Sequence, residues 1–446
     1  MPAGSIVVAA LAIGVVVGGG WLSWRRPTVL LAVALASLAV RPQLFFGGPA
    51  VAYEWGPHHT LLLLALVVNA LRYGIRRSIN WPLLALIAAF ALALVAGDLH
   101  ARLTWPFMAM SLAILALPWC FTSVVLEPGS RRAYALVIAL APLLSVATGA
   151  LMALAGIRAG FFQYDRLEGA TGNAAAFAIL AFAGFVVALH ELSRPGRPFA
   201  GALAVVNLAL VILSGTRMAI AASGVFLIAY LVLSETLRER LLAHRARTAT
   251  GIAVVVAALL WYWPILEARL FEAGRDLETV AIDDVGLNLS GRDDVWKFYF
   301  EEFKFSPLFG RGMGAGFVAA ADWIPWARKT PHNEYLHLLV NVGVVGFVLF
   351  AAAIFVWYRN LVRVASDNDR KFLIALLPAI GLFAITEDIL VFPTGLALFA
   401  YLGVLLTKRS AEASARARRP RRRRSRSAVG AQPGGVIRPI PGDGRP

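Results

Sequence analysis

Charged residues are scarce in this chain of 446 residues. They make up only 15% of the sequence, whereas hydrophobic residues make up 59%, and the mean hydropathy is +0.71. A soluble domain of this length does not need so much apolar surface, but a bundle of membrane-spanning helices does. The composition therefore argues against a soluble protein and predicts an all-α polytopic membrane protein.

Cysteine is almost absent, since Cys120 is the only one. One cysteine excludes an internal disulfide, so stability must come from helix packing. The sequence also lacks a serine or cysteine nucleophile elbow. Asp367 and Asp369 form a D-x-D pair, but they fall on the opposite predicted side of the membrane from His332, and the His58–His59 pair has no further ligands nearby in sequence. We therefore expect neither a metal nor another cofactor.

The net charge of +16 does not indicate nucleic-acid binding, because much of it lies in a proline-interrupted basic run at residues 416–426. Such a run has no apolar face and is typical of disordered chain. We predict that residues 408–446 form a disordered cytoplasmic tail that interacts with anionic lipids.

Apolar runs of roughly spanning length predict about 12–13 transmembrane helices. They cover residues 5–22, 27–46, 59–74, 81–97, 104–125, 134–157, 173–191, 199–214, 218–234, 249–266, 334–358, 372–386 and 389–407. Residues 1–407 are thus expected to form one transmembrane domain. Its single long polar loop, at residues 267–333, should carry short interfacial helices.

Lysine and arginine are unevenly divided between the short loops. Alternate loops hold most of them, for example those with Arg25 and Arg26, with Arg131, and with Arg194 and Arg197. The positive-inside rule places these loops in the cytoplasm, on the same side as the basic tail. The long loop then faces outward, so an enzyme of this layout would be a multi-pass protein with its active site at the outer face of the cytoplasmic membrane.

His332 lies where the long loop meets the next apolar run. Thr330 is suited to cap that helix and Pro331 to begin it, which would place His332 in the first turn. The positive end of a helix disfavours protonated imidazole, so His332 should be neutral and able to accept a proton. The alternative interpretation is a capping histidine without a chemical role.

Arg292 is expected at the start of another helix in the long loop. Ser290 and Asp293 have the form of a capping box, and Ser306-Pro307 should end the helix. Aromatic side chains at helical spacing suggest that it lies at the bilayer interface, namely Trp296, Tyr299, Phe300 and Phe303. A cation beside a positive helix end is favourable when an anion is shared between them. Arg292 would otherwise only extend toward the lipid headgroups.

Three further features face the same side. Arg217 stands in a short turn between two apolar runs, where an ionisable residue either faces a water-filled cavity or partner or extends to the headgroups. Asn173 begins a span, where an asparagine is suited to cap the helix. The glycine-rich residues 310–316 lack the lysine of a phosphate-binding loop, so we interpret them as a flexible turn.

Taken in order, these segments resemble the O-antigen ligase/polymerase family. The matching elements are Arg-x-x-Gly-x-x-Gly-Asn ending at Asn173, Ser-Gly-Thr-Arg at 214–217, Gly-Arg292 followed by Trp296, Pro-Leu-Phe-Gly-x-Gly at 307–312, and His-Asn-x-Tyr-Leu at 332–336 with Gly343-x-x-Gly346. The order and spacing match over about 160–350. The resemblance implies a GT-C-like membrane glycosyltransferase.

That family moves a glycan from undecaprenyl pyrophosphate to an acceptor hydroxyl without a metal. The resemblance implies that His332 activates the acceptor and that Arg217 and Arg292 bind the pyrophosphate. The supporting residues would be Asn173, Arg166, Asn333 and Tyr335. The implied partners are a lipid-linked oligosaccharide donor and a glycan or glycolipid acceptor. We favour an O-antigen ligase-like activity, and the alternatives are a polysaccharide polymerase of the same family or a transporter of an anionic solute.

Overall fold

The computed structural model describes residues 24–40, 57–76, 117–156, 162–163, 165–197, 199–271, 292–312, 315, 331–387, 389 and 392–406. The expected spans at 5–22 and 81–97, and the expected tail at 408–446, lie outside these residues. Their structure is therefore still a prediction from the sequence.

The described chain is almost wholly helical. The helices are α2 (Pro27–Ser37), α4 (Pro57–Tyr73), α7 (Arg131–Leu154), α8 (Ala174–Leu192), α9 (Ala200–Leu213), α10 (Arg217–Leu233), α11 (Glu235–Ala243), α12 (Arg245–Phe271), α13 (Arg292–Phe305), α15 (Glu334–Val364), α16 (Asp367–Phe383) and α17 (Leu396–Leu405), with short 3-10 turns η1 (Gly169–Thr171) and η2 (Pro393–Gly395). Two short strands, β1 (Phe162–Gln163) and β2 (Arg166–Leu167), pair in antiparallel fashion.

Within the described ranges, four helices are long and apolar enough to cross a membrane, namely α7, α8, α12 and α15. The bent pair of α10 and α11, with an angle of 95°, could provide a fifth span. The expected all-α polytopic membrane protein is thus confirmed. Most helix limits fall within a few residues of the apolar runs, because a spanning helix ends where polar residues begin.

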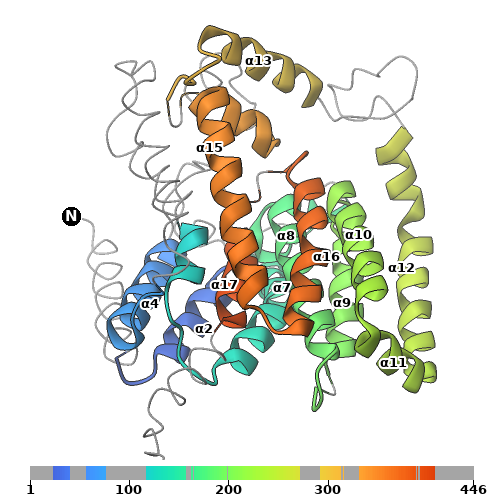
Figure 1. Ribbon diagram of the computed structural model, residues 1–446. Helices are drawn as coiled ribbons and strands as arrows, with labels where there is room; N and C mark the ends of the chain where they lie inside the picture. Colours follow the sequence, from blue (N-terminus) through green and yellow to red (C-terminus); the bar gives the residue numbers. More distant parts are fainter. Residues whose placement is uncertain are drawn as a thin grey trace, which may run out of the picture.

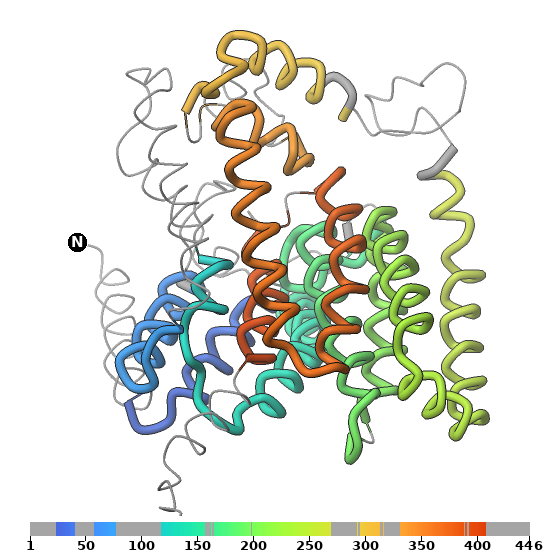
Figure 2. The backbone as a smooth tube through the Cα atoms, in the orientation of Figure 1, coloured from blue at the N-terminus to red at the C-terminus, as the bar shows by residue number. Residues whose placement is uncertain are grey.

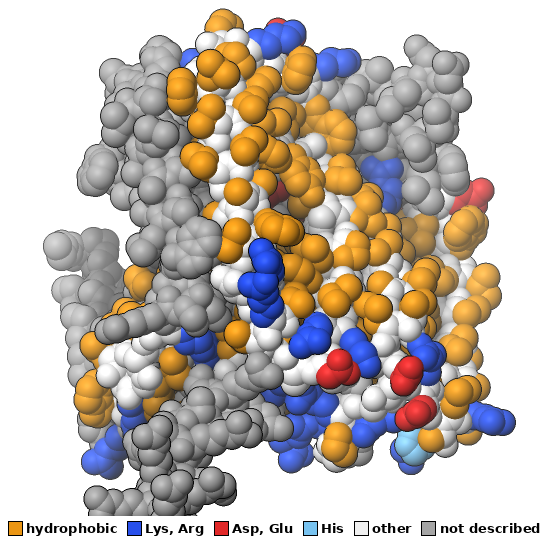
Figure 3. Space-filling model, in the orientation of Figure 1, with side chains coloured by type: hydrophobic (Ala, Val, Ile, Leu, Met, Phe, Trp, Pro, Cys, Tyr) orange, Lys and Arg blue, Asp and Glu red, His pale blue; other side chains and the backbone are white. Residues whose placement is uncertain are grey.

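The long helices stand side by side, and α13 lies across one end of them (Figure 1). The connections from α8 to α9, from α10 to α12 and from α15 to α16 all lie at the opposite end (Figures 1 and 2). In Figure 3 the flank of the bundle is mainly hydrophobic, and lysine and arginine gather mainly over that same opposite end. The end beneath α13, called the site end below, carries the turns that hold the predicted functional residues.

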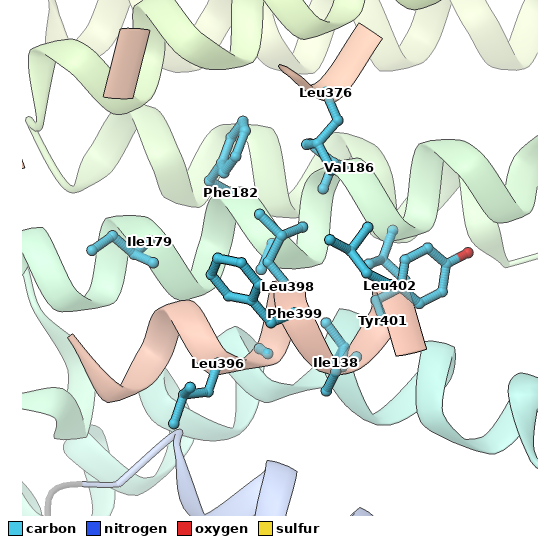
Figure 4. Close-up of a cluster of buried hydrophobic side chains, with 14 of the residues drawn as sticks. Ile138, Ile179, Phe182, Val186, Leu376, Leu396, Leu398, Phe399, Tyr401 and Leu402 are labelled. Atoms are coloured by element: carbon cyan, nitrogen blue, oxygen red, sulfur yellow. The ribbon is translucent and has the colours of Figure 1, made fainter. Parts of the chain in front are cut away.

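The core forms around α8 and α17, whose residues are almost all buried. Phe399 and Leu402 of α17 pack between Ile138 of α7 and Phe182 and Val186 of α8 (Figure 4). In a membrane the lipid tails are as apolar as the side chains, so helices associate through close packing of this kind and not through the hydrophobic effect. The core therefore fixes the helices whose ends build the site.

An ion-pair network ties the helices together at the end remote from the site. Arg131 Nη2 of α7 lies 3.0 Å from Asp369 Oδ1 of α16, and Arg131 Nε lies 3.2 Å from Glu191 Oε1 of α8. Tyr401 of α17 donates to Glu191 at 2.9 Å, and Arg194 also contacts Asp369. One carboxylate of the D-x-D sequence is thus neutralised by arginines, as buried charge requires.

Candidate functional site

The start of α15 differs from the sequence prediction. Asn333, rather than Thr330, is the N-cap, and its side chain accepts a hydrogen bond from the Leu336 backbone nitrogen at 3.0 Å. Helix α15 begins at Glu334, so Pro331 is not its first residue. The prediction was wrong because Asn333 adopts the extended backbone that an N-cap needs (φ −153°, ψ 103°). Thr330 lies outside the described residues.

His332 therefore stands before the cap, outside the first turn. Its φ of 46° is in the left-handed region, which residues other than glycine seldom adopt. Such strained conformations cluster at functional sites. The interpretation of His332 as a capping residue is excluded because Asn333 fills that position. The sequence had predicted that the positive end of a helix would act on the His332 imidazole. The structure instead places the Glu387 carboxylate beside it.

Glu387 connects His332 to Arg292. Its Oε1 lies 2.8 Å from Arg292 Nη2, and its Oε2 lies 3.6 Å from His332 Nδ1. The Glu387 side chain is only 1% exposed, compared with 24% for Arg292 and 31% for His332. Burial alone would raise the pKa of Glu387, but the charge of Arg292 and the contact with His332 hold its pKa below the ordinary value. Glu387 is thus a buried carboxylate held between two more accessible groups.

Helix α13 brings Arg292 to this position. It runs from Arg292 to Phe305 and ends before Ser306-Pro307, as the sequence predicted, while Ser290 of the predicted capping box lies outside the described residues. Trp296 Nε1 donates to the Pro331 carbonyl at 2.7 Å, which joins α13 to the segment before His332. The predicted aromatic stripe is divided, since Tyr299 is fully buried against α15 while Phe300 is half exposed. Part of the stripe therefore contacts protein where we had expected the bilayer interface.

Two more contacts join the start of α15 to the end of α16. Tyr335 donates through its hydroxyl to the Gly381 carbonyl at 2.8 Å. The Glu334 backbone nitrogen donates to the Ala384 carbonyl at 2.9 Å. Tyr335 therefore acts at the boundary between these helices, and Asn333 acts as the cap, so both support the position of His332.

A second cluster surrounds the turn before α10. Arg166 donates from Nε to the Ser214 carbonyl at 3.0 Å and from Nη2 to Thr216 Oγ1 at 2.8 Å. Tyr262 of α12 donates to the Asp165 carbonyl at 2.6 Å, so α12 also supports this turn. Arg217 follows directly as the first residue of α10.

Asn173 acts next to this cluster as the predicted cap of α8. Its side-chain oxygen accepts from the backbone nitrogens of Ala175 at 2.8 Å and Ala176 at 3.1 Å. The Thr216 hydroxyl donates to the Ala174 carbonyl at 3.4 Å. Asn173 and Arg166 thus hold the backbone that presents Arg217.

Both clusters lie at the site end. Helices α10 and α16 pack side by side and run in opposite directions (Figure 1). Arg217, the first residue of α10, therefore lies at the same end of the bundle as Phe383, the last residue of α16. Glu387 follows four residues after Phe383. Among the described residues, no three His, Cys, Asp or Glu side chains are grouped to hold a metal ion.

Fold and site together define a polytopic α-helical membrane protein with arginines, a histidine and a buried carboxylate at one end. The O-antigen ligase family model matches residues 202–351, which include Arg217, Arg292 and His332. This match, over part of the chain, supports an assignment to the O-antigen ligase/polymerase family. This points to a glycosyltransferase-like enzyme with a lipid-linked sugar donor and a glycan acceptor. No curated protein matches the chain.

Glu387 is the residue that the sequence reasoning missed. It lies between the last two apolar runs, outside the residues that carry the family resemblance. The available signal was its position, since an acidic residue in an outward turn next to apolar runs often has a partner. Only the folded chain brings it to Arg292 and His332.

Proposed function

We propose that this protein transfers a glycan from a polyprenyl pyrophosphate to an acceptor sugar hydroxyl at the outer face of the bacterial inner membrane. The observation that carries the proposal is Glu387, which holds Arg292 and His332 at one site inside an O-antigen ligase-type protein. Glycosyl transfer requires a base that accepts the acceptor's proton and a cation that stabilises the negative charge of the leaving group. His332 can supply the first and Arg292 the second.

His332 is the general base of the proposed reaction. Its Nδ1 faces Glu387, so Nε2 can receive the proton of the acceptor hydroxyl. The 3.6 Å separation is longer than a hydrogen bond, but such contacts often tighten only when substrate binds. A carboxylate behind the imidazole selects the tautomer and stabilises the imidazolium that forms. The acceptor oxygen then bonds to the sugar as the bond from that sugar carbon to pyrophosphate breaks.

Arg292 and Arg217 bind the leaving pyrophosphate in this proposal. Glu387 engages only Nη2 of Arg292, and an arginine carries five N–H donors, so others can point at phosphate oxygens. Arg217 adds a second guanidinium at the site end. Two arginines can stabilise the charge on the leaving group electrostatically. We therefore propose a metal-independent reaction, for which a chelator such as EDTA should leave the rate unchanged.

The distribution of charge supports the proposed orientation. Lysine and arginine gather mainly at the end remote from the site, which the positive-inside rule assigns to the cytoplasm. The site end then faces the periplasm, where both substrates would be presented. A ligase and a polymerase share this chemistry and differ in the acceptor, so a lipid-linked glycan as acceptor would indicate the polymerase.

The test uses protein reconstituted in liposomes with a polyprenyl-pyrophosphate glycan donor. We expect His332→Ala and Glu387→Gln each to lower transfer by about 10²- to 10⁴-fold. The matched control is His244→Ala, which changes an exposed histidine at the opposite end. Transfer by His332→Ala at the rate of the control would contradict the proposal. Movement of an anionic solute without transfer would favour a transporter instead.

A further inference from the structure

Helix α15 is broken where it passes beneath α13. Gly343 has φ 64° and ψ −175°, which divides α15 into residues 334–342 and 344–364. The two parts run in different directions (Figure 2). A broken helix leaves backbone N–H and carbonyl groups without their usual partners, which is costly at membrane depth. These backbone groups therefore need hydrogen-bond partners from another segment.

Residues 307–312 provide these partners. Arg311 and Gly312 donate their backbone N–H groups to the carbonyls of Val340 and Asn341, at 2.9 and 3.1 Å. In the other direction, the N–H groups of Val344 and Val345 donate to the carbonyls of Pro307 and Leu308, at 2.8 and 3.0 Å. We call residues 307–312 and 340–345 the backbone clasp. Residues 307–312 are thus hydrogen-bonded to α15 on both sides of the break, and the start of the predicted flexible turn at 310–316 takes part through Arg311 and Gly312.

The clasp requires glycine at two positions. A Cβ atom at Gly310 would lie 2.5 Å from the Asn341 carbonyl group, and one at Gly343 would lie 2.4 Å from the Leu308 carbonyl group. Real Cβ atoms do not approach backbone so closely, so the two segments would have to separate. Both glycines also have positive φ, at 72° and 64°, where a side chain adds strain.

The clasp also joins the two parts of the chain that carry Arg292 and His332. Tyr299 of α13 packs against Val340 of the first part of α15. Arg311 of the clasp forms an ion pair with Glu302 of α13. Helix α13, the clasp and residues 331–342 therefore form one outer unit. Glu387 is not part of this unit, because it follows α16.

We propose that the clasp is a positioning element for transfer. It sets the angle between the two parts of α15, and so brings Arg292 and His332 to Glu387 together. Gly310 and Gly343 are then positioning residues, although neither touches the groups that react. This inference rests on the proposed function.

Alanine variants of the two glycines test the proposal. Gly310→Ala and Gly343→Ala should each lower transfer per inserted molecule by about 10- to 100-fold, since a displacement of about 1 Å can cost that much. Gly196→Ala is one control, because Gly196 has φ 72° but open space around it. Gly403→Ala is the other, because a Cβ there would lie 2.3 Å from the Phe121 carbonyl oxygen, in the core.

A double-mutant comparison distinguishes positioning from general destabilisation. In a Glu387→Gln background, Gly343→Ala should cost less than about twofold, because the geometry that it disturbs is already lost. Gly403→Ala should have the same effect in both backgrounds. An equal multiplying loss from Gly343→Ala in both backgrounds would overturn the proposal.

A milder variant covers the case in which the glycine variants do not insert. Trp296→Phe removes one hydrogen bond of the outer unit, to the Pro331 carbonyl, and keeps an aromatic ring. It should lower transfer in wild type but not in Glu387→Gln, and equal losses in both would overturn the proposal. If His332→Ala is fully active, the proposed function itself fails. If His332→Ala is inactive but the clasp variants match their controls, only the positioning role fails.

Discussion

The two carboxylate oxygens of Glu387 face different partners, so this one residue positions both Arg292 and His332. Oε1 is at hydrogen-bond distance from Arg292, whereas Oε2 faces His332 at a longer distance. Removing one member of a buried pair leaves the other charge without compensation. Substitution of Glu387 should therefore disturb both side chains at once, which a substitution of either alone would not do.

The lowered pKa of Glu387 predicts how stability depends on pH. A carboxylate with a pKa below its unfolded value stabilises the folded state above the unfolded pKa, and this contribution is lost as pH falls through the folded pKa. For Glu387 the ordinary value is 4.5. The difference in melting temperature between wild type and Glu387→Gln should be full at pH 7 and shrink only below pH 4.5. A difference that is constant down to strong acid would contradict the ionised state.

The two arginines predict a non-additive pair. If Arg217 and Arg292 hold one pyrophosphate, each alanine variant should lose several kcal/mol of transition-state stabilisation. The double variant should then be little slower than the slower of the two single variants. Lysine should rescue only in part, because it cannot make a bidentate contact. Transfer rates at matched expression measure this. Arg238→Ala, an exposed arginine of α11, is the control, and small additive losses would mean that the pair does not share a ligand.

At the scale of the elements, the sequence predicted most helices but not how their ends are built. Hydrophobic runs and the stop at Ser306-Pro307 located α13 and α15 well, because both signals are local. The cap of α15 was misplaced, since Thr330 and Asn333 are both good capping residues and only the fold selects one. The clasp could not be predicted, because it joins segments about 30 residues apart through backbone atoms, which leave no pattern beyond glycine.

The corrected cap gives its own prediction. Asn333→Ala should cost about 1 kcal/mol of stability at the start of α15, and Asn333→Asp should restore most of it, because aspartate caps equally well. Hydrogen exchange of the Leu336 amide, which donates to Asn333, reports this locally. Unchanged exchange in Asn333→Ala would show that the cap adds nothing to the helix.

At the scale of the whole molecule, composition and hydropathy predicted the fold class, whereas the outward orientation inferred from the loop charges is still a prediction. These signals could not locate Glu387 relative to His332, which is 55 positions earlier in the sequence, because the contact depends on how α15 and α16 pack. Local sequence patterns singled out Arg217, Arg292 and His332, and the family resemblance implied their catalytic roles, which are still predictions.

The basic tail provides the test at this scale. Truncation after Thr407 should leave transfer unchanged in neutral detergent, because the predicted role of the tail is attraction to anionic lipid, at about 1 kcal/mol per residue near the surface. In vesicles with anionic lipid, the isolated tail should bind and lose binding at high salt. A large loss of turnover in detergent would show that the tail acts on the enzyme itself.

The separation of the two clusters has a consequence for the order of events. Arg292 belongs to the outer unit, whereas Arg217 starts a helix of the bundle, and Arg166 holds the turn that precedes it. A pyrophosphate bound by both arginines would therefore form a further link between the outer unit and the bundle, which α15 and α16 already connect. The donor would then complete the fold as well as supply the sugar, and its binding energy would appear as thermal stability before any acceptor arrives.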